Sequence, residues 1–134
     1  MKLRRSPLMI ALLATMALAG CHSKTDAPVA PATVNVQHLN GSTEVKKHPQ
    51  RIVVLDYASL ETLQLLGVEP LALPGNRKNL PDSLKRYQDD KYLNAGTLFE
   101  PDMAVLRAAK PDLILIAGRA SKAYDELNAL APTL

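Results

Sequence analysis

The sequence predicts an α/β domain built on a Rossmann-like parallel sheet, and three observations indicate it. Two short apolar runs, within Arg51 to Asp56 and Leu113 to Ile116, lack the polar alternation of a half-exposed strand. Such runs are typical of strands buried on both faces of a sheet. Between them, a stretch with leucine at helical spacing, Ala58 to Leu66, leads into another apolar run, Pro70 to Leu73. Strand, helix and strand in this order form a βαβ unit of a parallel sheet.

The amino-terminal 20 residues have the pattern of a secretion signal. Three basic residues precede the apolar stretch from Leu8 to Ala19, which is too short to span a membrane comfortably. We therefore expect residues 1–20 to be a signal peptide that is not part of the fold.

The single cysteine, Cys21, follows Leu18-Ala19-Gly20 at the end of this stretch. A lone cysteine cannot form an internal disulfide, so the role of Cys21 has to be inferred from its position in the sequence. Leu-Ala-Gly-Cys resembles the lipobox of bacterial lipoproteins, which implies lipidation of Cys21 and anchoring to a membrane. The alternative is a free cysteine near an ordinary cleavage site. Residues 21–33 are small, polar and contain proline, which predicts a flexible tether.

Residues 34–134 are expected to form the folded domain, beginning with a β-hairpin. Val34 and Val36 alternate with polar residues before Asn40-Gly41, which is expected to supply the turn. No metal site is expected, because His38 and His48 lie on this polar ribbon without a close third ligand. The later elements are predicted from apolar spacing and from Gly and Pro punctuation. They are a loop over 74–81, a short helix from Pro81, a strand over 92–95, a helix from Pro101, a strand over 113–116, and a last helix capped by Ser121.

The charge balance argues against nucleic acid as a partner. The chain has 16 Lys and Arg; three lie in the signal peptide, which leaves 13 against 13 Asp and Glu. A positive site on the folded part must therefore be a local cluster. Ligands of open parallel sheets bind outside the carboxyl ends of the strands, where Arg119, Tyr57 and the adjacent pair Arg77 and Lys78 are expected. These four residues are the predicted ligand-binding residues.

Catalysis is not expected. Ser59 and Ser121 lack the GxSxG context of a hydrolase, and no glycine-rich phosphate-binding motif follows a strand. We therefore predict a binding protein with no catalytic residues.

Five segments together resemble the first lobe of periplasmic siderophore-binding proteins, the ferric-siderophore and vitamin B12 type of substrate-binding component of ABC importers. They read RIVVLDYASLETLQLLGVEPLALP, RKNLPDSL, KYLNAGTLFEPD, KPDLILIAGR and APTL. The resemblance covers roughly residues 33 to 134, and it is greatest to lipoprotein members that bind ferric catecholate or petrobactin-like siderophores. It implies an α/β lobe that forms one side of a ligand cleft in a two-lobed protein, outside the cytoplasm, in the periplasm or on the outer face of the cell membrane.

The same resemblance implies roles for particular residues. Arg119 and Lys78 match family positions in or near the ligand site, and the ligand would be an anionic ferric siderophore that brings its own iron, so no cofactor is expected. Members of the family dock on the membrane permease through a glutamate whose position is Ala104 here. Glu100 and Asp102 lie nearby and could substitute for it. The alternative functions are a truncated or split fragment without independent substrate binding and a lipoprotein interaction module.

Overall fold

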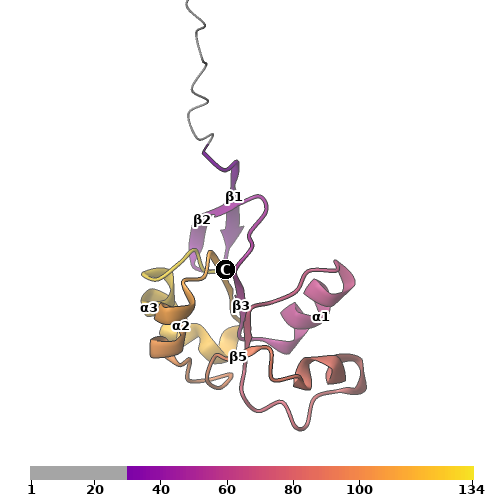
Figure 1. Cartoon of the computed structure of the whole chain (residues 1–134). Coiled ribbons are helices and arrows are strands. Elements are labelled where there is room, and N and C mark those ends of the chain that lie inside the picture. Colours follow the sequence, from indigo (N-terminus) through magenta and orange to yellow (C-terminus); the bar gives the residue numbers. More distant parts are fainter. Residues whose placement is uncertain (1–29) are drawn as a thin grey trace, which may run out of the picture.

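The computed structural model describes residues 30–134, so the predicted signal peptide, Cys21 and most of the predicted tether lie outside the described residues. A four-stranded parallel sheet forms the centre of the fold, in the order β5-β4-β3-β6 (Figure 1). Its strands are β3 (Ile52–Val54), β4 (Ala72–Leu73), β5 (Leu93–Asn94) and β6 (Leu113–Leu115). All three pairings are parallel. The predicted α/β class with a parallel sheet is therefore confirmed.

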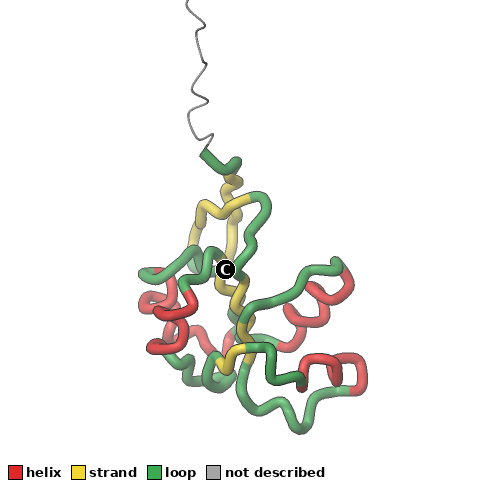
Figure 2. The backbone as a smooth tube through the Cα atoms, viewed as in Figure 1, coloured by secondary structure: helices red, strands yellow, loops and turns green. Residues whose placement is uncertain are grey.

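Helices cover both faces of the sheet (Figures 1 and 2). One face carries α1 (Tyr57–Leu65) and the 3-10 helix η1 (Asp82–Gln88); the other carries α2 (Met103–Ala109), the 3-10 helix η2 (Gly118–Ala123) and α3 (Tyr124–Asn128). Alternate side chains of the first parallel strand serve the two faces: Ile52 and Val54 belong to one buried cluster, and Val53 belongs to the other. This two-sided burial explains why the strand reads as a continuous apolar run.

The predicted hairpin is present, with its turn one residue earlier than expected. Strands β1 (Thr33–His38) and β2 (Gly41–Lys46) are antiparallel, and His38 pairs with Gly41. The two turn residues are therefore Leu39 and Asn40, and not Asn40-Gly41. Gly41, at φ +128°, begins the second strand in a conformation that favours glycine.

The helix ends follow the expected chemistry in two places. The Asp56 carboxylate accepts the N–H of Ser59 and caps α1, and Gly67 follows this helix with φ +68°. The helix predicted from Pro101 begins at Met103, because Asp102 is its N-cap and accepts the N–H groups of Ala104 and Val105. No helix among residues 30–134 is long and apolar enough to cross a membrane.

The short helix predicted from Pro81 is present as the 3-10 helix η1, which buries Leu84 and Tyr87. The prediction that Ser121 caps the last helix was wrong. Ser121 lies inside η2 and donates its hydroxyl to the carbonyl of Gly118, so it does not cap α3. A hydroxyl that reaches back to the carbonyl three residues earlier is no longer placed to accept the N–H groups of a following helix.

Strand β6 has a backbone partner on each side. It pairs with β3, and the segment Pro132 to Leu134 runs along its other edge. The N–H of Ile114 donates to the carbonyl of Pro132 at 2.9 Å, and the N–H of Leu134 donates to the carbonyl of Ile114 at 3.0 Å. Although β6 is the last named strand of the sheet, its backbone is therefore hydrogen-bonded along both edges. This pairing fixes the position of the strand from which the following residues, including Arg119, extend.

Asp112, before β6, holds the starts of two strands together. Its carboxylate accepts the N–H of Arg51 at 2.8 Å, the N–H of Gln50 at 3.1 Å and the ammonium of Lys46 at 3.3 Å. Burial alone would raise the pKa of Asp112, but these three donors outweigh it and hold the pKa below its usual value. The aspartate of the KPDL segment thus has a structural role, at the opposite end of β6 from Arg119.

We expect Asp112→Ala to lower the free energy of unfolding by about 2 kcal/mol at neutral pH, since hydrogen bonds to a charged group are worth about 1.5–3 kcal/mol. The native pKa is lowered, so the carboxylate stabilises the fold fully above the usual aspartate pKa of about 3.9, and this stabilisation is lost as the pH falls through the native pKa. Urea denaturation at several pH values measures both effects. Asp82→Ala is the control, because Asp82 is exposed and, among residues 30–134, forms an ion pair with Lys85 alone. Equal stability of Asp112→Ala and the unaltered chain at neutral pH would contradict this role.

Candidate functional site

The order of the strands creates a point where the chain reverses its direction across the sheet. It proceeds from β3 to β4 and β5, and then returns to place β6 on the other side of β3. In such sheets the crevice at the carboxyl ends of the two strands flanking the reversal is the usual ligand site. Here those ends lead into Tyr57 and Arg119. Two of the four predicted ligand-binding residues therefore flank the reversal point.

Tyr57 begins α1 and is held by its hydroxyl. The phenol donates to the carbonyl of Asn76, in the loop after β4, at 3.0 Å. Burial raises the pKa of the Tyr57 phenol, and the positive charges of Arg119 and Arg77 partly oppose this effect. The phenol is consequently neutral at physiological pH, and both guanidinium groups are close enough for their charges to act on it.

A cavity of about 280 Å³ lies beside Tyr57. The carboxyl ends of three strands contribute to its wall: Tyr57 after β3, Asn76 and Asn79 after β4, and Phe99 after β5. Amide side chains both donate and accept hydrogen bonds, whereas the two rings give apolar surface. This combination suits a ligand that carries both polar and aromatic parts.

Arg119 is exposed in η2, and no hydrogen bond or ion pair joins its guanidinium to another described residue. It lines a second cavity, of about 430 Å³, with Phe99, Glu100 and Lys122. A 3-10 helix has three residues per turn, so Arg119 and Lys122 project from the same side of η2. The volume is within the range typical of small-molecule sites, about 300–1,000 Å³.

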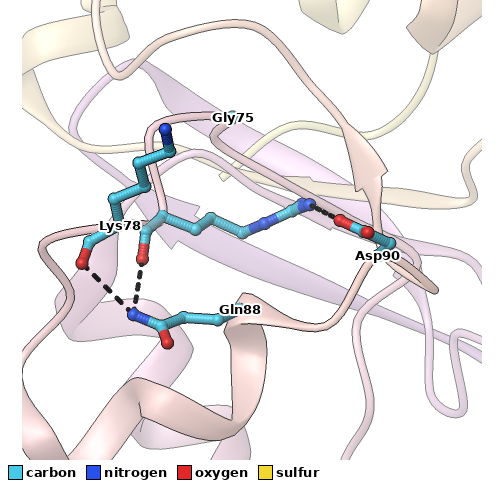
Figure 3. A pocket seen from close by; sticks show the side chains of 5 residues that line it. Gly75, Lys78, Gln88 and Asp90 are labelled. Atoms are coloured by element: carbon cyan, nitrogen blue, oxygen red, sulfur yellow. Dashed lines mark hydrogen bonds and ion pairs between the residues drawn. The ribbon is translucent and has the colours of Figure 1, made fainter.

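Within residues 30–134, the two adjacent cations Arg77 and Lys78 differ, because the Arg77 side chain bonds to other residues and the Lys78 side chain does not. The Arg77 guanidinium donates to the carbonyl of Tyr92 at 3.1 Å and lies 3.9 Å from the carboxylate of Asp90. Gln88 donates its amide to the backbone carbonyls of both residues, and the Lys78 side chain extends away from it (Figure 3). The Lys78 ammonium has no partner among the described residues. Arg77 thus holds the loop in place, and Lys78 is the cation that the loop presents.

The two acidic residues near the family docking position also differ. Asp102 uses one carboxylate oxygen to accept the N–H groups of Ala104 and Val105, both at 3.0 Å, and its role is that of a helix cap. Glu100 is exposed in the preceding loop, on the wall of the cavity that contains Arg119. Of the two candidates, only Glu100 has a carboxylate without a described hydrogen bond.

Reasoning from the sequence missed several residues of this edge, which are Asn76, Asn79, Phe99 and Lys122. Phe99 is the only phenylalanine in the chain, and it lies in a loop directly after a predicted strand. These two facts together could have indicated Phe99 as a candidate ligand-binding residue. Lys122 could have been found from its spacing of three residues from Arg119, once that segment was recognised as a 3-10 helix.

The fold and this edge define one α/β lobe of the substrate-binding class of proteins, and comparisons with known proteins narrow the class. No family model matches the chain. It is 35% identical over 133 residues to the petrobactin-binding protein YclQ of Bacillus subtilis, covering 95% of this chain and 42% of the relative. It is 36% identical to the probable siderophore-binding lipoprotein YfiY of the same organism, covering 100% of this chain and 43% of the relative.

The solved structures agree. The periplasmic catecholate-siderophore binding protein VctP from Vibrio cholerae matches with a TM-score of 0.71 at 44% identity, covering 77% of this chain and 37% of that protein. The chain is thus similar to siderophore-binding members of the substrate-binding proteins of ABC transporters, the resemblance that the sequence predicts. It spans about two-fifths of the length of the curated relatives it matches, 42% and 43%. All three of these relatives are named as binding proteins, in agreement with the binding protein that the sequence predicts.

Proposed function

We propose that the chain binds an anionic ferric siderophore at the carboxyl edge of its sheet and serves iron uptake through an ABC importer. The observation that carries this proposal is Arg119: an exposed guanidinium without a described partner, located where the strand order reverses. Ferric siderophores of the catecholate type are bulky anions whose iron is already fully coordinated. Such a ligand needs cations and hydrogen-bond donors from the protein, and no metal-ligating side chains.

The four predicted ligand-binding residues take different parts in this proposal. Arg119 supplies positive charge from η2 and Lys78 from the loop after β4, and Tyr57 supplies an aromatic wall at the carboxyl end of β3. Arginine is well suited to this task because it keeps its charge when partly desolvated and donates through a planar fork. Arg77 acts indirectly, through its bond to the carbonyl of Tyr92, by fixing the loop that carries Lys78.

We further propose that Cys21 is lipidated after removal of residues 1–20, and that the residues between Cys21 and the start of β1 at Thr33 tether the domain outside the cytoplasm. The relative YfiY is named as a probable siderophore-binding lipoprotein, which supports this assignment. Several acyl chains on one cysteine give stable anchoring, since each buried CH₂ contributes about 0.8 kcal/mol. The permease of the importer is the proposed protein partner, with Glu100 as the docking acid of this lobe.

The direct test is titration of the chain with the gallium complex of a tris-catecholate siderophore, which has the charge of the ferric complex but is diamagnetic. We expect saturable shifts of amide resonances after β3, β4, β5 and β6. The affinity should fall as ionic strength rises from about 0.01 to about 1 M, because the Debye length shrinks from about 30 to about 3 Å. The absence of saturable shifts at low salt would refute binding by this chain and would favour the alternative of a fragment without independent substrate binding.

A further inference from the structure

Phe99 is a large apolar side chain held in solvent on a well-fixed loop. Its side chain is 65% exposed. The loop is closed by the N–H of Thr97, which donates to the carbonyl of Glu100 at 2.9 Å. The Thr97 hydroxyl oxygen accepts the N–H of Phe99 at 3.2 Å and that of Glu100 at 2.9 Å. The ring is therefore presented from a backbone that is already ordered, and ligand binding would not have to order it.

The position of Phe99 is as informative as its exposure. It is the residue common to the cavity beside Tyr57 and the cavity that contains Arg119 and Lys122. A ligand that fills both cavities would therefore contact Phe99. The aromatic contacts within the described residues join His38 with Tyr124 and Tyr87 with Tyr92, so no ring of this part of the chain lies against Phe99.

We propose that Phe99 is a specificity-determining residue that stacks on an aromatic ring of the bound siderophore and favours aryl ligands over aliphatic ones. This inference rests on the proposed function. An aryl oxyanion can direct its charge toward Arg119 while its ring lies against Phe99, because the two side chains line one cavity. An aliphatic polycarboxylate is equally able to use the cations, but it has no ring to stack. The cations thus provide attraction for any anionic complex, and Phe99 discriminates among them.

The test compares two gallium complexes, a tris-catecholate and citrate, in titrations of the unaltered chain, Phe99→Leu and Phe99→Tyr. Phe99→Leu keeps an apolar side chain and removes the ring, so we expect the tris-catecholate affinity to fall about threefold to tenfold. The citrate affinity should be unchanged, and Phe99→Tyr should keep the tris-catecholate affinity. Thermal unfolding of the variants serves as a control for the fold, which we expect to be intact because Phe99 is mostly exposed.

The outcomes separate this inference from the proposed function. If the unaltered chain binds neither complex, the proposed function fails and the inference fails with it. If the unaltered chain binds the tris-catecholate, but Phe99→Leu leaves that affinity unchanged or lowers both affinities equally, the inference alone is overturned. A loss confined to the tris-catecholate and restored by Phe99→Tyr supports it, since a purely structural role of Phe99 would affect both ligands.

Discussion

Replacing Gly96 by alanine should lower the free energy of unfolding by about 3 kcal/mol or more. Gly96 has φ +95°, a conformation that residues with a side chain rarely adopt, and left-handed backbone costs about 1–2 kcal/mol. A Cβ atom there would also lie 2.4 Å from the carbonyl oxygen of Glu100 and 2.5 Å from the backbone nitrogen of Asp102. Because both of these atoms belong to the backbone, the contact cannot be relieved by a side-chain rotation.

The location of Gly96 adds a second effect to the loss of stability. Its N–H donates to the side chain of Asn94, and its carbonyl accepts the N–H of Gly75. The first bond ties the Phe99 loop to the end of β5, and the second ties it to the loop after β4. We therefore expect Gly96→Ala to disorder the Phe99 loop in the protein that remains folded, which would appear as lost amide signals for residues 97–100.

Gly118→Ala is the matched control for Gly96→Ala. A Cβ atom at Gly118 would meet no heavy atom within 4 Å, and the backbone is outside the glycine-favouring region. This substitution should change the free energy of unfolding by less than about 0.5 kcal/mol. Chemical denaturation followed by circular dichroism measures both variants. Equal midpoints for Gly96→Ala and Gly118→Ala would show that the loop can relax around a side chain, contrary to our account.

Replacing Arg119 by glutamine should have the largest effect on ligand binding of any single cation. A charge-assisted hydrogen bond contributes about 1.5–3 kcal/mol, which corresponds to a loss of affinity of about 10-fold to 100-fold for the gallium tris-catecholate. Glutamine keeps most of the length and some donors, so the variant removes mainly the charge and the fork. Stability should not change, because the guanidinium has no described partner within residues 30–134.

Arg107→Gln is the control for the loss of one positive charge. Arg107 is exposed in the last turn of α2, a helix that begins just after the Phe99 loop and leads away from it. Its substitution changes the net charge of the chain by the same amount, but we expect the affinity to stay within about twofold, since exposed charges beyond a Debye length are largely screened. Isothermal calorimetry gives the affinities. Equal losses for the two variants would indicate a diffuse effect of charge and not a site at Arg119.

Much of the fold could be predicted because the strands are buried on both sides. Ile52, Val53 and Val54 are all buried, and such a run has few interpretations other than a central strand. The end of a helix at Gly67 and the end of a strand near Gly96 could also be predicted, because both positions have the positive φ that favours glycine. The exact turn of the hairpin could not be predicted, because Asn40-Gly41 and Leu39-Asn40 differ by one residue and the register of the two strands decides between them.

The sequence pointed to residues of the candidate site where a polar or aromatic side chain comes shortly after a strand, as Tyr57 and Arg119 do. It was missed where the side chain belongs to a loop whose path depends on tertiary contacts. Asn76 is near Tyr57 because its carbonyl accepts the phenol, a contact across 19 residues that no local pattern encodes. The difference between Arg77 and Lys78 likewise depends on a distant acceptor, the carbonyl of Tyr92. Adjacent basic residues look equivalent until their partners are known.

The most direct test of the site is to replace gallium by iron in the same siderophore and to compare the two amide spectra of the chain. High-spin ferric iron broadens the signals of nearby nuclei, whereas gallium does not. We predict that broadening is greatest at Tyr57, Asn76, Phe99 and Arg119, which lie at the carboxyl ends of the strands. It should be weakest at Lys46 and Asp112, at the opposite ends. Broadening centred on Asp112, or spread evenly over the surface, would contradict a ligand site at the reversal point of the sheet.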